Sequence, residues 1–134
     1  MPFLFESLKV YQNALNFAHE ANTLTESFTR GTFFLSDQLN RASLSVAANI
    51  AEGNGRFQKA DRIHFFRIAR GSAFECVPIL EICKRKQLIT EELNNRLKLK
   101  LDEIGKMLTG LINHKELLPN PPQPKDPSPC PNPN

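Results

Sequence analysis

The sequence predicts an all-α protein: an antiparallel up-down four-helix bundle followed by a disordered, proline-rich C-terminal tail. Apolar residues recur at three- and four-residue spacing through most of the chain, and no strand-like alternation competes with that pattern. Four helical segments of good length joined by short links favour a bundle. The last sixteen residues contain eight prolines, which neither a helix nor a sheet accommodates. We therefore divide the 134-residue chain into a bundle, residues 1–118, and a tail, residues 119–134.

The first predicted helix runs from Leu8 to about Phe28, with its apolar residues close to three-and-four spacing. A connection with Gly31 as the breaker follows it. Ser36 or Asp37 is expected to cap the second helix, because both side chains accept hydrogen bonds from the free N–H groups of a first turn.

The second helix is predicted to end in the stretch NIAEGNGR, residues 49–56, where two glycines precede a basic residue. A phosphate-binding loop needs a strand before its glycines and a helix after them. A helix precedes them here, so we expect Gly53 or Gly55 to adopt the left-handed conformation that commonly ends a helix.

The third predicted helix, residues 59–86, is apolar on several sides and must therefore be covered on several sides. Pro78 lies inside it and has no N–H for the carbonyl of Phe74, which predicts a kink or local break. The fourth helix is expected to start after a Thr90 cap, with Glu91 and Glu92 favourably placed near the positive end of the helix dipole. Its predicted inner face consists of Leu93, Leu97, Leu101, Ile104, Leu108, Leu111 and Ile112.

The formal net charge of +3 is unevenly distributed. Residues 36–89 carry nine basic and five acidic side chains, a local charge of +4, which hints at an anionic partner. Cys76, Cys83 and Cys130 form no disulfide framework, so we expect reduced thiols and a cytoplasmic protein. No run of eighteen apolar residues and no signal peptide is apparent, so no membrane association is expected.

Four polar residues lie among apolar neighbours of the second and third predicted helices. Asn49 falls on the predicted core face, Glu52 is close to it, and Arg70 and Glu75 are candidate partners. Buried polar groups without partners cost on the order of 1–3 kcal/mol each. These residues are therefore expected to form either a structural hydrogen-bond network that fixes helix register or a small functional site.

Four segments of the chain resemble a known family: LKVYQNAL (8–15), LSDQLNRASLSVAANIAEGNGR (35–56), FRIARGSAFEC (66–76) and IGKMLTGLI (104–112). They are similar to the bacterial four-helix-bundle proteins first noticed as reading frames inside intervening sequences of large-subunit ribosomal RNA genes. The resemblance implies an antiparallel bundle that assembles as a homopentameric ring and has no established activity. A distant branch, the accessory proteins of diversity-generating retroelements, binds nucleic acid and a reverse transcriptase. Asn40 stands where many members have an arginine, which removes one basic group.

The charge distribution and the resemblance together favour RNA or DNA binding through Arg41, Arg56, Lys59, Arg62 and Arg67. No base-reading motif is present, so the contacts are expected to go to the backbone. A ring would make the phosphate contacts of one subunit several times over, and the larger total would raise the affinity for nucleic acid.

The alternative is an oligomeric scaffold that docks a partner protein and has no nucleic-acid role. The surplus apolar surface of the third helix calls for cover, and subunit association is its simplest source. We expect Phe65, Phe66 and Phe74 in that interface. The proline-rich tail could be a ligand for a proline-reading domain or only a solubilising end.

Neither an enzyme nor a cofactor is expected. His19, His64 and His114 fall on different predicted helices, and no histidine or cysteine has metal-ligand spacing. Glu52 and Glu75 could approach one another and act as an acid–base pair. However, neither has the histidine three residues on that a di-iron bundle requires.

Overall fold

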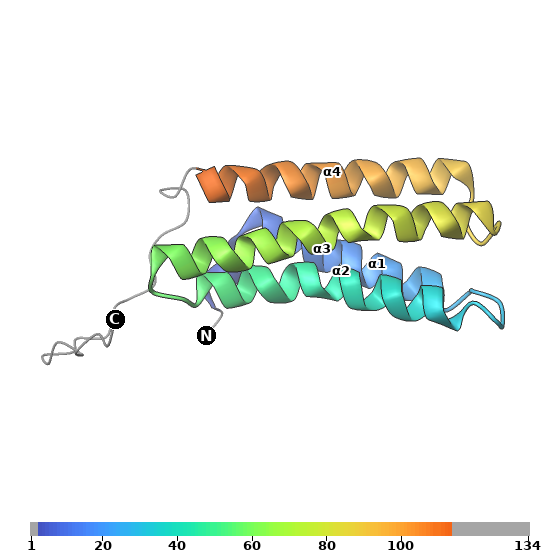
Figure 1. Ribbon diagram of the computed structural model, residues 1–134, viewed down its shortest axis with the longest axis horizontal. Coiled ribbons are helices and arrows are strands. Elements are labelled where there is room, and N and C mark those ends of the chain that lie inside the picture. The colour runs from blue at the N-terminus through green and yellow to red at the C-terminus, as the bar shows by residue number, and fades with distance from the viewer. Residues whose placement is uncertain (1–2, 114–134) are drawn as a thin grey trace, which may run out of the picture.

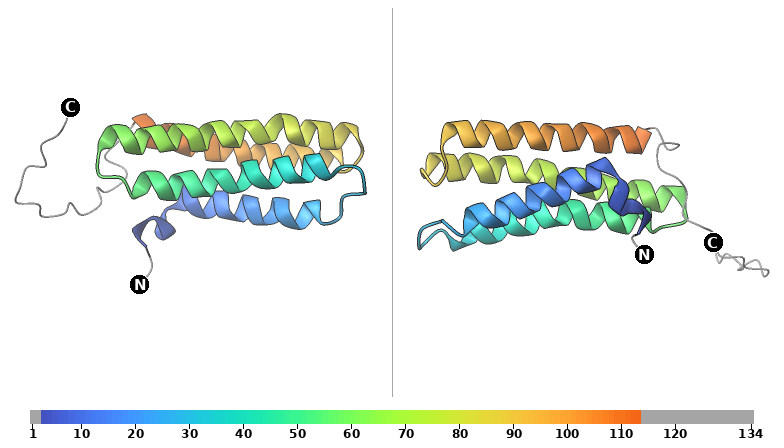
Figure 2. Two further views of the ribbon diagram at one scale, coloured as in Figure 1. Left: turned by 60° about the horizontal axis from the view of Figure 1, so that its bottom comes forward. Right: turned by 180° about the vertical axis from the view of Figure 1, so that it is seen from behind.

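The computed structural model describes residues 3–113, which form a short 3-10 helix and four long α-helices (Figure 1). The elements are η1 (Leu4–Ser7), α1 (Lys9–Thr25), α2 (Phe33–Asn54), α3 (Lys59–Arg85) and α4 (Glu91–Asn113). Successive helices run antiparallel (Figure 2): the α1–α2 and α3–α4 connections share one end, and the α2–α3 connection and η1 share the other. The predicted all-α bundle is confirmed, and no strand occurs between residues 3 and 113. The predicted tail and the boundary after residue 118 lie outside the described residues.

The second helix begins earlier than predicted. The residue before its first turn is Thr32, whose carbonyl accepts hydrogen bonds from the N–H groups of Leu35 and Ser36 at 3.1 and 3.2 Å. Gly31 turns the chain immediately before this point with a φ of +89°, so the helix can start at once. Ser36 and Asp37 lie inside α2, and the prediction that one of them caps it is wrong.

Gly53 and Gly55 do not adopt the left-handed conformation that the sequence predicted. Gly55 follows α2 with a φ of −80°, and Gly53 lies inside the helix. A Cβ atom on Gly53 would stand 2.9 Å from the ring of Phe66, 3.0 Å from Cβ of Phe65 and 3.1 Å from the carbonyl oxygen of Arg62. Gly53 is therefore a point of close approach between α2 and α3.

The third helix passes through Pro78 without the local break that was predicted. Pro78 and Phe74 are both exposed, so the carbonyl that lacks its helical partner lies on the solvent side of the helix, where water can bond it. The Thr90 cap of α4 is confirmed, because its Oγ1 accepts a hydrogen bond from the N–H of Leu93 at 3.1 Å.

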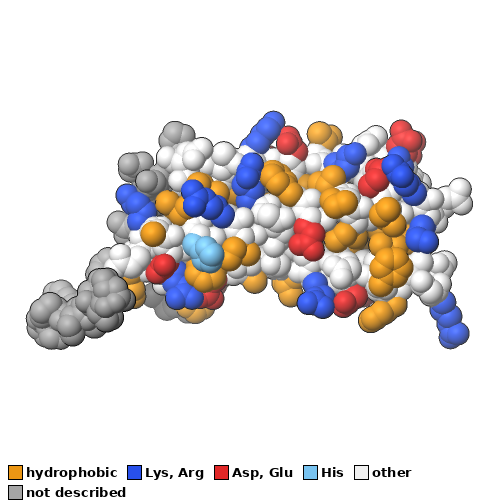
Figure 3. All heavy atoms as spheres, in the orientation of Figure 1, with side chains coloured by type: hydrophobic (Ala, Val, Ile, Leu, Met, Phe, Trp, Pro, Cys, Tyr) orange, Lys and Arg blue, Asp and Glu red, His pale blue; other side chains and the backbone are white. Residues whose placement is uncertain are grey.

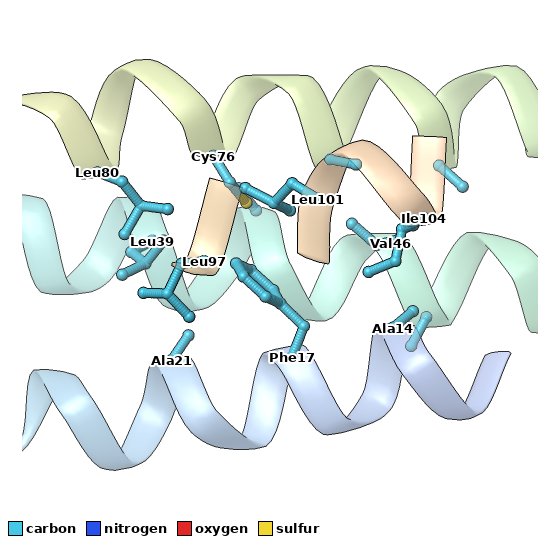
Figure 4. Close-up of a cluster of buried hydrophobic side chains, with 14 of the residues drawn as sticks. Ala14, Phe17, Ala21, Leu39, Val46, Cys76, Leu80, Leu97, Leu101 and Ile104 are labelled. Carbon is cyan, nitrogen blue, oxygen red and sulfur yellow. The ribbon is translucent and has the colours of Figure 1, made fainter. Parts of the chain in front are cut away.

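The core lies along the centre of the bundle and draws on all four helices (Figure 4). α3 lies between α2 and α4 (Figure 1), and its several apolar sides are explained largely by these two neighbours rather than by a missing partner. Most of the predicted inner face of α4 is buried, namely Leu97, Leu101, Ile104, Leu108 and Leu111, whereas Leu93 and Ile112 are half-buried. None of the helices between residues 3 and 113 combines the length and the apolarity needed to cross a membrane.

An ion cluster joins α1 to α4. The carboxylate of Glu20 lies 2.5 Å from the guanidinium of Arg96 and 2.9 Å from the ammonium of Lys100. Partial burial raises the pKa of Glu20, but the two cations outweigh that effect and hold the pKa below its ordinary value of 4.5.

Replacing Glu20 by glutamine is expected to lower the free energy of unfolding by about 1 kcal/mol at neutral pH, because the pair is partly exposed. A depressed carboxylate pKa contributes stability above the unfolded-state value, and that stability is lost as the pH falls through the folded-state pKa. The free energies of unfolding of the two proteins in urea should therefore differ at pH 7, and the difference should shrink progressively as the pH falls below 4.5. Asp102→Asn is the matched control, since its pair with Lys106 is local and well exposed. A difference between wild type and Glu20→Gln that persists in acid would contradict the assignment.

Candidate nucleic-acid interface

The corner between α2 and α3 brings together several of the cations predicted from the sequence. Arg56 lies in the connection, and Lys59 opens α3. Arg67 follows two turns later on the exposed side of the same helix. Lys59 and Arg67 are both exposed and form no ion pair with any residue between 3 and 113. Two cationic side chains are thus available to a dissolved anion.

Arg56 is held in place on two sides. Its guanidinium lies 2.6 Å from the carboxylate of Glu52, one turn back on α2. The same guanidinium stands 4.7 Å from the centre of the Phe65 ring on α3. The carboxylate offsets part of the charge, while the ring supports the guanidinium from the α3 side.

Arg41 is the most distant of the predicted cations. It is exposed, and its guanidinium lies 3.6 Å from the carboxylate of Asp37. It precedes Arg56 by fifteen residues, which is roughly 20 Å along the helix axis. Its role in nucleic-acid binding stays a prediction.

Arg62 does not belong to the exposed cations, and its assignment to the nucleic-acid contacts is corrected. Only 5% of its surface is exposed. Its side chain shares the inward face of α3 with Phe66 and Ala69, four and seven residues on. Burial lowers the pKa of the guanidinium from its ordinary value. The helical register, not the charge, decides where this arginine points.

The four polar residues predicted to form a network are not joined into one. Asn49 donates through its amide to the carbonyl and the Oγ of Ser45 at 2.8 and 2.9 Å. Ser45 in turn hydrogen-bonds the Oγ of Ser72 on α3 at 2.9 Å. The polar link between α2 and α3 is therefore Asn49–Ser45–Ser72, and the sequence pattern did not reveal the two serines.

Glu52 and Glu75 are both exposed and do not form an acid–base pair. Ser45 contacts Ser72, so in this antiparallel pair Glu75 lies beside the first half of α2. Glu52 is near the other end of α2, about 15 Å away along the axis. Paired-carboxylate chemistry is thus not supported by the geometry.

Arg70 and Phe74 form a second cation–aromatic pair, on the α4 side of α3. The guanidinium stands 4.6 Å from the centre of the ring. Both residues line a groove of about 250 Å³ between α3 and α4, to which Lys106 and Thr109 also contribute. Nε of Arg70 is buried and has no hydrogen-bond partner among residues 3–113. The terminal amino groups likewise make no hydrogen bond or ion pair there.

The face formed by α2, α3 and α4 shows many basic side chains with apolar ones between them (Figure 3). Of the three phenylalanines expected in a subunit interface, Phe66 is 2% exposed and belongs to the core, so this prediction is wrong. Phe65 is half-buried beneath Arg56, and Phe74 is 45% exposed. Phe66 points inward because it lies four residues after Arg62 and seven before Ala73.

Within the described residues, the histidines and cysteines do not lie together in a common site. His19 is on α1 and His64 on α3, and no group of three or more potential metal ligands occurs within residues 3–113. His114 and Cys130 lie outside this range. Burial, with the charge of Glu75, raises the pKa of the Cys76 thiol to about 12, and burial also raises the pKa of Cys83. Both thiols are therefore protonated and poorly nucleophilic at neutral pH.

A family model of the 23S rRNA-intervening sequence protein matches residues 6–110. The chain belongs to this family. The resemblance found in the sequence motifs is thereby confirmed over almost the whole bundle. Solved structures are also similar to this chain. One is the 1.70 Å crystal structure of a protein with unknown function from the S23 ribosomal protein family of Bacteroides thetaiotaomicron. It is 30% identical, superposes with a TM-score of 0.72, and the match covers 77% of this chain and 97% of that one. No curated protein sequence matches. Neither description names an enzymatic activity.

Proposed function

We propose that this member of the family is a self-associating helical bundle that binds the backbone of nucleic acid through the corner between α2 and α3. The observation that carries the proposal is the pair of exposed cations, Lys59 and Arg67, without an acidic partner among residues 3–113. Exposed lysines and arginines bind phosphates chiefly through charge and counterion release, so the interaction does not require a base-reading element. Arg56 adds a third, partly neutralised cation.

Self-association is supported by a groove on another side of the bundle. Between α1 and α2, Leu15, Ala18 and Leu44 line a groove of about 460 Å³. Leu15 is 43% and Leu44 57% exposed, an apolar surface that a second copy of the chain would cover. If this groove binds a different surface of the next copy, repeated copies form a closed ring when the rotation between neighbouring subunits adds up to a full turn. Five copies are the number that the family resemblance implies.

A ring of this kind brings several cationic corners onto one nucleic-acid strand. The affinity then rises with the number of phosphates neutralised, and its salt dependence becomes steeper. In this way a corner that offers two free cations per subunit among the described residues would bind a polyanion.

Docking of a partner protein is a second candidate function. Phe33 and Phe34, at the start of α2, are 78% and 56% exposed. They lie at the end of the bundle opposite the cationic corner (Figure 1), so a protein bound there would not need the cations. A pull-down in the presence of nuclease would favour this function if it recovers a stoichiometric protein partner. The Phe33→Ser variant should then fail to recover that partner.

The double substitution Lys59→Glu with Arg67→Glu is expected to weaken RNA and duplex DNA binding by at least about tenfold at low salt. Each lost phosphate contact should also lower the slope of log affinity against log salt by about 0.9. Affinity measured across a salt series, on protein freed of nucleic acid, gives both quantities. Arg62 is left unchanged, because reversing a buried arginine would test folding instead.

Lys86→Glu with Lys98→Glu is the matched control. Each control lysine lies well away from the α2–α3 corner, yet the change in net charge is the same. The control pair should bind nearly as well as the wild type. Equal losses in both double variants would show that only net charge matters, and no binding even at low salt would reject the nucleic-acid role.

A further inference from the structure

Backbone charge alone does not account for the two arginine–phenylalanine pairs that flank α3. Arg56 lies over Phe65 and Arg70 lies over Phe74, at 4.7 and 4.6 Å from the ring centres. Phe65 faces α2, where its Cβ approaches Gly53, and Phe74 faces α4. A point contact with phosphate does not require a guanidinium to be placed over a ring, since lysine serves equally well.

The Arg70–Phe74 pair packs against a glycine of α4. A Cβ atom on Gly105 would stand 2.9 Å from Cε1 and 3.3 Å from Cζ of the Phe74 ring. Glycine at position 105 therefore leaves room for the ring in its present place, and a Cβ atom there would require the ring to shift. The ring in turn supports one face of the Arg70 guanidinium, whose terminal amino groups have no partner among residues 3–113.

The Arg56–Phe65 pair is fixed by the carboxylate of Glu52, at 2.6 Å from the guanidinium. The carboxylate weakens Arg56 as a phosphate ligand because it offsets the positive charge. It does not change the flat, partly exposed guanidinium plane. The Arg56–Phe65 pair therefore presents a ligand with a planar surface and with little net positive charge.

Guanidinium planes and aromatic rings are the surfaces on which unpaired nucleobases stack. In a duplex the faces of the bases are covered by their neighbours, whereas in a single strand they are free. Phe65 and Phe74 are nine residues apart on α3, about 13 Å along its axis, and the exposed Arg67 lies between them in the chain. Nine residues are about two and a half helical turns, so the two rings project to opposite sides of α3, toward α2 and α4. A single strand that crosses the exposed face of α3 between them would meet Arg56, the free cation Arg67 and Arg70.

We propose that the ligand of this surface is single-stranded nucleic acid, with bases stacked on Arg56 and Arg70 and phosphates held by Lys59 and Arg67. This inference rests on the proposed function and specifies its substrate class. Stacking on a planar group tolerates any base, so no sequence preference follows.

The test compares an oligothymidylate with a duplex DNA of equal length, by fluorescence anisotropy of the full chain at one salt concentration. The wild type should bind the oligothymidylate more tightly than the duplex. The double substitution Arg56→Lys with Arg70→Lys keeps the charge and removes the planes, so it should weaken oligothymidylate binding by about tenfold and leave duplex binding unchanged. Arg85→Lys is the matched control and should alter neither affinity, because Arg85 is exposed at the opposite end of α3, pairs with Glu81 and has no ring partner among residues 3–113.

Gly105→Ala provides an independent variant that changes no charge and no stacking residue. Its methyl group should displace the exposed Phe74 ring, and the oligothymidylate affinity should fall while duplex affinity holds. Duplex binding equal to or tighter than oligothymidylate binding, or equal losses in Arg85→Lys and the double variant, overturns the inference and leaves the proposed function standing. Binding of neither probe at low salt overturns both.

Discussion

Leu44→Glu is expected to give a 15.2 kDa monomer where the proposed assembly gives the wild type a larger mass, as measured by size-exclusion chromatography with light scattering. Leu44 lines the α1–α2 groove and is 57% exposed, so the single chain can accept a charge there without losing its core. In an assembly the same position would be covered, and a carboxylate buried without a partner opposes association strongly. Because each subunit of a ring uses the same contact, a single substitution acts on every interface.

Leu99→Glu is the matched control for that experiment. Leu99 is on α4, is 71% exposed and does not line the groove. The control should retain the mass of the wild type, and far-ultraviolet circular dichroism should show the same helix content in all three proteins. If Leu99→Glu alone dissociates the assembly, the contact surface lies on α4 and the groove assignment is wrong.

The fold could be predicted because its strongest signals are local. Three-and-four apolar spacing marks each helix, and Thr90 followed by two glutamates marks the start of α4. Those signals do not depend on how the helices are placed against one another. The helix ends were less secure, since Thr32 rather than Ser36 or Asp37 precedes α2.

The candidate site was only partly predictable, because the exposure of each of its side chains depends on which face of its helix is turned toward the core. Arg62 carried the same charge as Arg67, yet only its spacing to Phe66 and Ala69 indicates the inward direction. Interhelical pairs are harder still. The contact between Ser45 and Ser72 needs the relative register of α2 and α3, which no single-helix pattern contains.

The arginine–phenylalanine pairs were missed for a related reason. The sequence led us to expect Phe65, Phe66 and Phe74 in a subunit interface, whereas Phe66 belongs to the core. Phe74 instead lies over Gly105, thirty-one residues further along the chain. A glycine inside a long helix is the one sequence signal that could have pointed to such a contact.

Gly53→Ala is expected to lower the free energy of unfolding by about 1–3 kcal/mol, the usual range for an overpacked contact. Helix propensity alone predicts the opposite sign, since alanine stabilises a helix interior by roughly 0.5–1 kcal/mol relative to glycine. The new methyl group would meet the Phe66 ring at 2.9 Å and the backbone oxygen of Arg62 at 3.1 Å. A buried ring and a helix backbone cannot move aside without separating α2 from α3.

Gly71→Ala isolates the propensity effect from the packing effect. Gly71 is exposed inside α3, and a Cβ there would meet nothing within 4 Å. This control should therefore gain about 0.5–1 kcal/mol. Urea unfolding compares both variants with the wild type at one protein concentration, because the proposed self-association would make the free energy of unfolding depend on concentration. Opposite signs for the two variants would establish that glycine at position 53 sets the separation of α2 and α3. That separation in turn positions Phe65 beneath Arg56. If Gly53→Ala were as stable as Gly71→Ala, the close approach of the two helices would be wrong, and with it the placement of the Arg56–Phe65 pair.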